Sequence, residues 1–303
     1  MGDGMLSKEY IIVIVTATIV GTLARLFSLK ADLRQYPSYP NGYLINLFVG
    51  FIAAAVGAVA LPALLTKNFT AITFLTVAIQ QFRDVRKAER DSLKDLENTE
   101  FTKRGDAYID GIAKTFEARN YISLIVSFMT AITMLLVKTK MVTLEILIGA
   151  IVGFIVFYLI KRYSKGKSIG DIADVREGKI EVRDSELFVD DLYVTNLLGT
   201  ENGQNLFQKE GIAVVIYPRE RHFSIALDNF GQRQAILFDA ARALGVKRYS
   251  FTRKEYAEGR IIITFVPIIH DVNKLIESVK NTPLLESVKK SHSVMQTNLV
   301  GKE

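Results

Sequence analysis

Three aspartates are the residues of this sequence whose type and spacing suggest chemistry. Asp84 follows one apolar segment, Asp106 precedes another, and Asp171 follows a third. A fold that stacks these segments would gather the three carboxylates at one surface. Two carboxylates in close contact share one proton, because both cannot ionise side by side. One then acts as a general base on water and the other as a general acid, which predicts hydrolysis of the aspartyl-protease type.

The sequence around Asp171 strengthens this hypothesis. Ile169-Gly170-Asp171 resembles part of the Gly-x-Gly-Asp signature of membrane aspartyl proteases, with Ser168 in place of the first glycine. Two other uses of the carboxylates remain open. They could form a divalent-cation site of oxygen ligands, or they could be solvated helix faces and caps. Asp171, Asp106 and Asp84 are therefore candidate catalytic residues.

Composition excludes several other kinds of chemistry. The chain has no cysteine, so disulfides, thiolate metal sites and a cysteine nucleophile are excluded. All three histidines lie in the last third of the sequence, which leaves little material for a histidine metal cluster. No P-loop, dinucleotide-binding glycine motif or serine-hydrolase elbow is present. We therefore expect no cofactor, and no metal unless the carboxylates form the divalent-cation site left open above.

Long apolar segments are the elements that must position the aspartates. Hydrophobic residues make up 49% of the 303 residues, and the mean hydropathy is +0.21. Segments of roughly membrane length occupy residues 10–28, 43–65, 69–82, 121–137 and 141–160, of which 69–82 is short. The sequence predicts an α-helical membrane bundle of about five spans in residues 1–165, with a cytosolic helical loop at 83–120.

The distribution of charge predicts an orientation. Residues 1–165 carry 19 Lys and Arg against 13 Asp and Glu, whereas residues 166–303 carry 19 against 19. The net charge of +6 therefore belongs to the apolar half, as in a membrane protein with basic cytosolic flanks. A nucleic-acid partner is not expected. Five spans place the N-terminus outside and the C-terminal domain in the cytosol.

Small and charged residues in the spans suggest how the helices pack. Gly149 and Gly153 form a GxxxG stripe, which suits internal packing of the bundle or a homo-oligomer. Arg25 and Glu145 lie near span ends. Charges inside a membrane are functional candidates, but at these positions we expect both side chains to reach the interface by snorkelling.

The C-terminal half predicts an α/β domain. Residues 166–205 are predicted as a β-rich linker region, 206–288 as a cytosolic α/β domain, and 289–303 as a flexible tail. The pattern of 206–288 is of the ββαββα type. It comprises strands at 211–217 and 223–227, a helix from Asp228 or Asn229 to Leu244, a hairpin at 246–267, and a helix at 270–280.

One short motif resembles a known family. Tyr108-Ile109-Asp110-Gly111-Ile112-Ala113 is similar to the sequence that names the YIEGIA family, multi-pass membrane proteins of endospore-forming Firmicutes. The flanking residues 116–121 and 169–174 fit this resemblance, as does the layout of spans and domain. The resemblance implies a role in sporulation. The family's glutamate is Asp110 here, so Asp110 is a poor candidate for a catalytic aspartate whose side-chain length would matter.

Three functions follow from these patterns. The first is a membrane aspartyl protease with its site at the cytosolic face and a protein substrate. The second is a non-enzymatic membrane scaffold or regulator that binds a protein partner through the α/β domain. The third, a transporter, has less support, because the spans hold few polar groups and show no inverted repeat. In each case the lipid bilayer surrounds the bundle.

Overall fold

The computed structural model describes residues 7–32, 40–139, 141–164 and 166–288; the predicted tail at 289–303 lies outside them. The chain forms two compact units. The first comprises residues 1–92 and 112–165, and the second comprises residues 93–111 and 166–303. The chain therefore passes between the units three times. Residues 166–205, predicted as a linker region, lie within the second unit.

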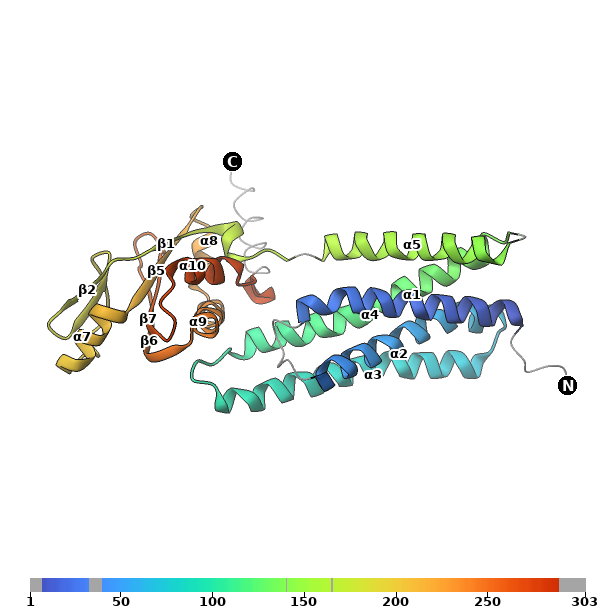
Figure 1. Cartoon of the computed structure of the whole chain (residues 1–303), viewed down its shortest axis with the longest axis horizontal. Coiled ribbons are helices and arrows are strands. Elements are labelled where there is room, and N and C mark those ends of the chain that lie inside the picture. The colour runs from blue at the N-terminus through green and yellow to red at the C-terminus, as the bar shows by residue number, and fades with distance from the viewer. Residues whose placement is uncertain (1–6, 33–39, 140, 165, 289–303) are drawn as a thin grey trace, which may run out of the picture. The chain divides into compact units, whose positions relative to one another are not determined.

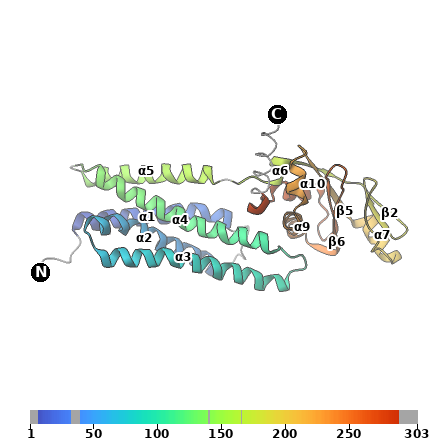
Figure 2. The ribbon, with the colours of Figure 1, turned by 180° about the vertical axis from the view of Figure 1, so that it is seen from behind.

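The first unit is a bundle of long helices. Its helices are α1 (Lys8–Asp32), α2 (Pro40–Leu65), α3 (Phe69–Leu96), α4 (Asp106–Leu136) and α5 (Val142–Tyr163). Successive helices run in opposite directions, so that the start of α1 and the end of α5 lie at opposite ends of the bundle (Figures 1 and 2). The last four residues of α3 and the first six of α4 belong to the second unit.

Four of the described helices are long and apolar enough to cross a membrane. They are α1, α2, α4 and α5. The predicted span at 69–82 is not among them, because α3 is apolar only as far as Phe82 and highly charged beyond it. The apolar part of α3 nevertheless runs alongside the other helices (Figure 1).

Hydroxyl groups and small residues join α1, α2 and α4. Ser123 Oγ on α4 donates hydrogen bonds to the carbonyl oxygens of Gly21 (2.7 Å) and Gly50 (3.0 Å). Ser127 Oγ donates to the carbonyl of Ala54 (2.6 Å). A side-chain hydroxyl can reach a neighbouring backbone only where the facing residue is small, as is typical of membrane helix contacts.

The glycine stripe of α5 packs inside the chain. A Cβ at Gly153 would collide with Thr130 Oγ1, and a Cβ at Gly149 would lie 2.5 Å from Met134 Cγ. Both contacts are with α4. The internal packing suggested by the GxxxG spacing is therefore present, and the surface of α5 that carries these glycines is buried.

Arg25 does not reach the interface by snorkelling, and this expectation was wrong. Its side chain is only 1% exposed. Its guanidinium lies 5.3 Å from the ring centre of Phe116 and donates to the carbonyl and side-chain oxygens of Asn46 (3.4 Å each). Its aliphatic stem occupies the space left by Gly50. Glu145, by contrast, accepts a hydrogen bond from Thr139 N (2.7 Å) in the connection before α5.

The second unit contains two antiparallel sheets. The larger has the order β1-β5-β7-β6, formed by Ala173–Glu177, Ile212–Pro218, Ile261–Pro267 and Val246–Lys254. The smaller has the order β2-β3-β4, formed by Ile180–Arg183, Glu186–Val189 and Leu192–Thr195. Helices of this unit are α6 (Ile169–Ile172), α7 (Glu201–Glu210), α8 (Phe223–Asp228), α9 (Phe230–Leu244), α10 (Val272–Asn281) and the 3₁₀ turn η1 (Glu97–Thr99).

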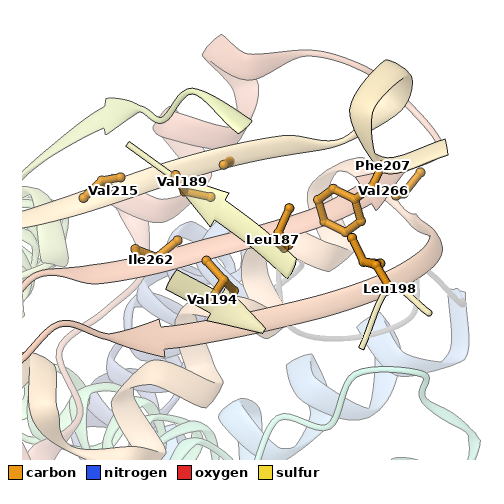
Figure 3. Packing of buried hydrophobic residues seen from close by; sticks show 9 residues of the cluster. Leu187, Val189, Val194, Leu198, Phe207, Val215, Ile262 and Val266 are labelled. Atoms are coloured by element: carbon orange, nitrogen blue, oxygen red, sulfur yellow. The ribbon is translucent and has the colours of Figure 1, made fainter. Parts of the chain in front are cut away.

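A hydrophobic core joins the two sheets. Figure 3 shows Leu187, Val189 and Val194 of the small sheet packed against Val215 and Ile262 of the large one. Alternate residues of β5 and β7 point to the other face of the large sheet, because successive side chains in a strand point in opposite directions. Both strands are buried over most of their length. The small sheet, predicted as part of a linker, thus completes the core.

One predicted strand is a helix, and that expectation was wrong. Residues 223–227 belong to α8, whose buried residues Ala226 and Leu227 follow Phe223 at helical spacing. Both edges of β5 are occupied, by β1 on one side and β7 on the other. A strand at 223–227 would therefore have no place beside β5. The predicted helix to Leu244, the hairpin and the final helix are confirmed as α9, β6–β7 and α10.

We expect the replacement Gly57→Val to destabilise the bundle. A Cβ at this position collides with the backbone carbonyl oxygen of Leu124, which cannot move without shifting α4. Overpacking of this kind typically costs about 1–3 kcal/mol. The control is Gly111→Ala, where a Cβ has no neighbour within 4 Å. Thermal unfolding in detergent should show a lower midpoint for Gly57→Val only; equal midpoints would contradict the close packing.

Candidate functional site

The YIDGIA motif lies in the first two turns of α4. Gly105 precedes the helix with φ +85°, and its carbonyl accepts hydrogen bonds from the backbone N–H groups of Tyr108 and Ile109 (3.1 Å each). Its own N–H donates to Glu97 Oε1 (2.9 Å). A Cβ at Gly105 would lie 2.6 Å from Gln234 Oε1. Glycine therefore satisfies both the left-handed backbone and the close approach of α9.

Tyr108 connects this helix start to α9. Its side chain is buried, and its hydroxyl donates to the carboxylate of Asp239, with O–O distances of 3.0 and 3.1 Å. Its ring packs edge-on against Phe238, with centroids 6.1 Å apart and an interplanar angle of 76°. All three residues belong to the second unit. The tyrosine, the first residue of the motif, thus anchors residues 93–111 to the α/β domain.

Asp239 is held from α10 as well. The Thr282 hydroxyl lies at its carboxylate, where it lowers the carboxyl pKa, and donates to the carbonyl of Ser278 (3.2 Å). Ser278 Oγ donates to the backbone carbonyl of Asp239 (3.0 Å). Thr282 is fully buried. The hydroxyl groups of Tyr108 and Thr282, which belong to different elements, therefore both lie at the carboxylate of Asp239. We call Tyr108, Asp239, Ser278 and Thr282 the tyrosine–aspartate clasp.

Burial governs the charge state of the clasp. It raises the pKa of the Asp239 carboxyl above the ordinary value of 3.8. The hydrogen bonds from Tyr108 and Thr282 and the charges of Arg242 and Arg104 oppose that rise only in part. The carboxyl is thus a partly buried acid that binds its proton more tightly in the folded than in the unfolded chain.

Arg104 packs beside the clasp. Its guanidinium lies 4.8 Å from the ring centre of Phe238 and 3.2 Å from Glu100 Oε1. The residue is buried, and its Nη1 has no hydrogen-bond partner among the residues that the structure describes. A cation over an aromatic face is stabilised by the ring quadrupole, more so when it is desolvated. This stacking further attaches the segment before α4 to α9.

Gln232 attaches the segment after α10 to the same helix. It is fully buried, its Nε2 donates to the carbonyl of Pro283 (3.1 Å), and its Oε1 accepts from the N–H of Leu285 (2.8 Å). Helix α9 itself begins where Asn229 accepts a hydrogen bond from Gln232 N (3.1 Å) and ends before Gly245, at φ +69°. The cap and stop predicted at Asn229 and Gly245 are confirmed.

The candidate catalytic aspartates have separate structural partners. Asp106 is 80% exposed and its carboxylate lies 2.8 Å from Lys94 Nζ. The Asp171 carboxylate accepts from Ser168 N (2.7 Å) and Ser168 Oγ (3.2 Å), which makes a capping box for α6. Asp84 is exposed on α3. The predicted sharing of a proton between two of them stays a prediction.

The other motif residues divide between buried and surface positions. Ile109, Ile112 and Ala113 are buried apolar residues of α4. Asp110 is half-buried, and Gly111 has open space at its Cβ position. Gly170 lies where a Cβ would come within 3.2 Å of Lys280 on α10, so its glycine serves close packing. No group of three possible metal-ligating side chains occurs among the described residues.

Sequence reasoning missed Asp239, Arg104 and Thr282. A signal was available for the first of these. Asp239 lies three and four residues after Ile236 and Ala235, both buried on α9, so its carboxylate falls on the apolar face of an amphipathic helix. A charged residue on such a face needs a partner. The partner, Tyr108, lies 131 residues away in the sequence, and only the fold identifies it.

Together these features define a class of protein. It has an apolar helical bundle and an α/β domain, and the first residues of α4 pack within that domain. A family model described as "YIEGIA protein" matches residues 13–295. This chain belongs to the YIEGIA family. It is 38% identical over 287 residues to "Uncharacterized protein YphB" of Bacillus subtilis (strain 168), covering 92% of this chain and 94% of that protein. No solved structure matches the chain significantly.

Removing the tyrosine hydroxyl should weaken the clasp. We expect Tyr108→Phe to lower the free energy of unfolding by about 1–3 kcal/mol, because a buried acceptor then loses a donor. The control is Tyr121→Phe on the same helix, whose ring packs against Phe82 and whose hydroxyl has no hydrogen bond among the described residues. Circular dichroism during thermal unfolding measures both. Equal midpoints for the two variants would contradict a stabilising role.

The clasp also predicts a pH dependence. A carboxyl with a raised folded pKa contributes stability below its unfolded pKa, near 3.8, and that contribution is lost as pH rises through the folded pKa. Asp239→Asn keeps an acceptor for Tyr108 and cannot ionise. Its stability relative to the wild type should therefore increase as the pH is raised from 4 towards 7. Parallel stability curves over this range would contradict the argument.

Proposed function

We propose that this chain is an integral membrane scaffold or regulator that binds a protein partner through its α/β domain. The N-terminus lies outside and the domain lies in the cytosol. The sporulation role implied by the family resemblance belongs to the same proposal. Support for the orientation comes from the distribution of Lys and Arg, because basic connections are retained on the cytosolic side of membranes.

One observation carries the proposal: the family motif is built into a structural clasp. Tyr108 is buried and donates to Asp239, and Ile109 packs in the interior. Residues of a catalytic centre must reach a substrate. The buried residues of this motif instead fasten the start of α4 to a domain, which is what a protein needs when it presents a binding domain at a membrane.

The domain also offers apolar side chains for a partner. Ile268 and Ile269 follow β7 and are 69% and 51% exposed. The backbone N–H groups of Ile268 and Ile269 donate to the carbonyls of Gly245 (3.3 Å) and Leu244 (3.0 Å), so the backbone is held while both side chains remain exposed. Adjacent exposed isoleucines on a rigid loop are favourable anchors, because little conformational entropy is lost when they are buried.

A membrane aspartyl protease is the second candidate, and one observation favours it. Asp106 and Asp171 belong to the same compact unit. Asp106 lies shortly before the chain returns to the bundle after Gly111, and Asp171 lies shortly after the chain leaves it at Gly166. Both carboxylates therefore lie close in sequence to a point where the chain passes between the two units, and both could contribute to one site. Asp106 instead forms an ion pair with Lys94, and Asp171 forms a capping box with Ser168. Both are structural roles, which support the scaffold.

Complementation distinguishes the two functions. The host is an endospore-forming Bacillus that lacks its own family member, the readout is sporulation efficiency, and protein level is measured by immunoblot. We expect Asp84→Asn, Asp106→Asn and Asp171→Asn to restore sporulation. We expect the double variant Ile268→Ser/Ile269→Ser to fail at normal abundance, because it loses apolar contact area without disturbing the core.

The opposite pattern would contradict the proposed scaffold function. Loss of sporulation in two of the aspartate variants at normal abundance, with a functional isoleucine variant, supports the protease. The conservative variant Asp110→Glu serves as the matched control, because it restores the family's glutamate. A deletion strain that sporulates like its parent contradicts the sporulation role itself.

A further inference from the structure

Exposed cations surround one end of the helical bundle. Arg83, Lys87 and Arg90 lie on α3, and Lys161 and Arg162 lie at the end of α5. All five are exposed, and none makes an ion pair with a residue that the structure describes. Their positions on α3 are four and three residues apart, so the three side chains share one helix face. We call these five residues the basic collar.

Contacts inside the bundle place the two parts of the collar at the same end. On α3, Phe82 packs edge-on against Tyr121, with centroids 5.9 Å apart, directly before Arg83. On α5, Phe157 packs in one cluster with Ala24 and Val126, one turn before Lys161. Figures 1 and 2 show α3 and α5 on opposite sides of the bundle. The collar therefore borders the bundle on two sides.

The collar begins where the exposed apolar surface of the same helices ends. On α3 this surface is formed by Phe69, Phe74, Val77 and Ile79. On α5 it is formed by Leu147, Ile151, Ile155 and Leu159. Apolar side chains that face outward along a membrane helix contact lipid tails. Cations that continue the same surface then lie at the level of the lipid headgroups.

The opposite end of the bundle carries no comparable excess. There Lys138 Nζ lies 3.7 Å from Glu9 Oε2, and the Glu145 carboxylate accepts from the Thr139 N–H. At that end Lys8, Lys67 and Lys138 stand against Glu9 and Glu145, whereas the five cations of the collar outnumber the exposed carboxylates of Asp84 and Asp91 on α3. The difference points to an anionic partner at one membrane face only.

We propose that the basic collar binds the phosphate groups of anionic phospholipids. Arginine and lysine are the residues that bind phosphate best, arginine through paired N–H donors. A lipid fits better than an acidic protein, because the cations are continuous with the lipid-facing surface on both α3 and α5. The inference rests on the membrane location in the proposed function, but not on partner binding by the α/β domain.

The test uses the full chain purified in neutral detergent. Its thermal midpoint is measured with phosphatidylglycerol, with phosphatidylcholine of the same acyl chains, and with inorganic phosphate. We expect phosphatidylglycerol alone to raise the midpoint. The shift should disappear in 1 M salt, where the Debye length falls to about 3 Å.

Two charge variants make the test specific. Arg83→Gln/Lys87→Gln/Arg90→Gln should lose most of the phosphatidylglycerol shift, and adding Lys161→Gln/Arg162→Gln should remove the rest. The control Lys8→Gln/Lys67→Gln/Lys138→Gln removes three charges from the other end of the bundle, as many as the first variant removes, and should keep the shift. These exposed side chains are outside the core, so each variant should fold.

Three outcomes would overturn the proposal. They are an equal shift with phosphatidylcholine, an equal shift with inorganic phosphate, and an unchanged shift in the collar variant. Alkaline extraction of membranes that contain the protein is measured first. Release by alkali contradicts the membrane location and the collar together. Retention of the protein without a phosphatidylglycerol response contradicts the collar alone and leaves the proposed function standing.

Discussion

The hydrogen bond from Tyr108 to the partly buried carboxylate of Asp239 is the interaction on which the attachment of residues 93–111 to the second unit depends. It brings residues 93–111 into a domain whose other residues follow 166. The carboxylate is costly to bury, and the hydroxyl groups of Tyr108 and Thr282 offset part of that cost. Removing one partner would leave the other polar group unsatisfied in the interior. This explains why the motif has a tyrosine at a position where its ring alone could be replaced by phenylalanine.

A different constraint shapes the bundle. Helices apolar enough to cross a membrane gain no hydrophobic free energy there from coming together, so close packing and hydrogen bonds must hold them. Gly21, Gly50 and Ala54 provide the close approach, and Ser123 and Ser127 donate to their carbonyls. Arg25 uses the space of Gly50 and remains buried over Phe116. Its burial shows that a charge near the end of a span need not reach the interface when a glycine leaves room for its stem.

The aspartates illustrate how the same residue type serves different purposes according to its surroundings. Asp106 near the start of α4 and Asp171 in α6 each lie in the first turn of a helix, where a negative charge is favourable. Asp239 lies in the middle of a helix on its buried face, where the charge is unfavourable and a hydroxyl must compensate. Asp239, the aspartate whose carboxyl pKa is raised by burial, has no sequence motif around it.

The sequence by itself determined the elements with a clear period or a clear terminus. The long apolar segments predicted the four helices that are apolar enough to cross a membrane. Asn229 and Gly245 predicted both ends of α9, because capping and positive φ are local effects. Only the tertiary structure decided that 223–227 is helical, since β1 and β7 occupy both edges of β5, and that 166–205 completes a core. It alone paired Tyr108 with Asp239, because a contact across 131 residues depends on how distant elements pack and leaves no local pattern in the sequence.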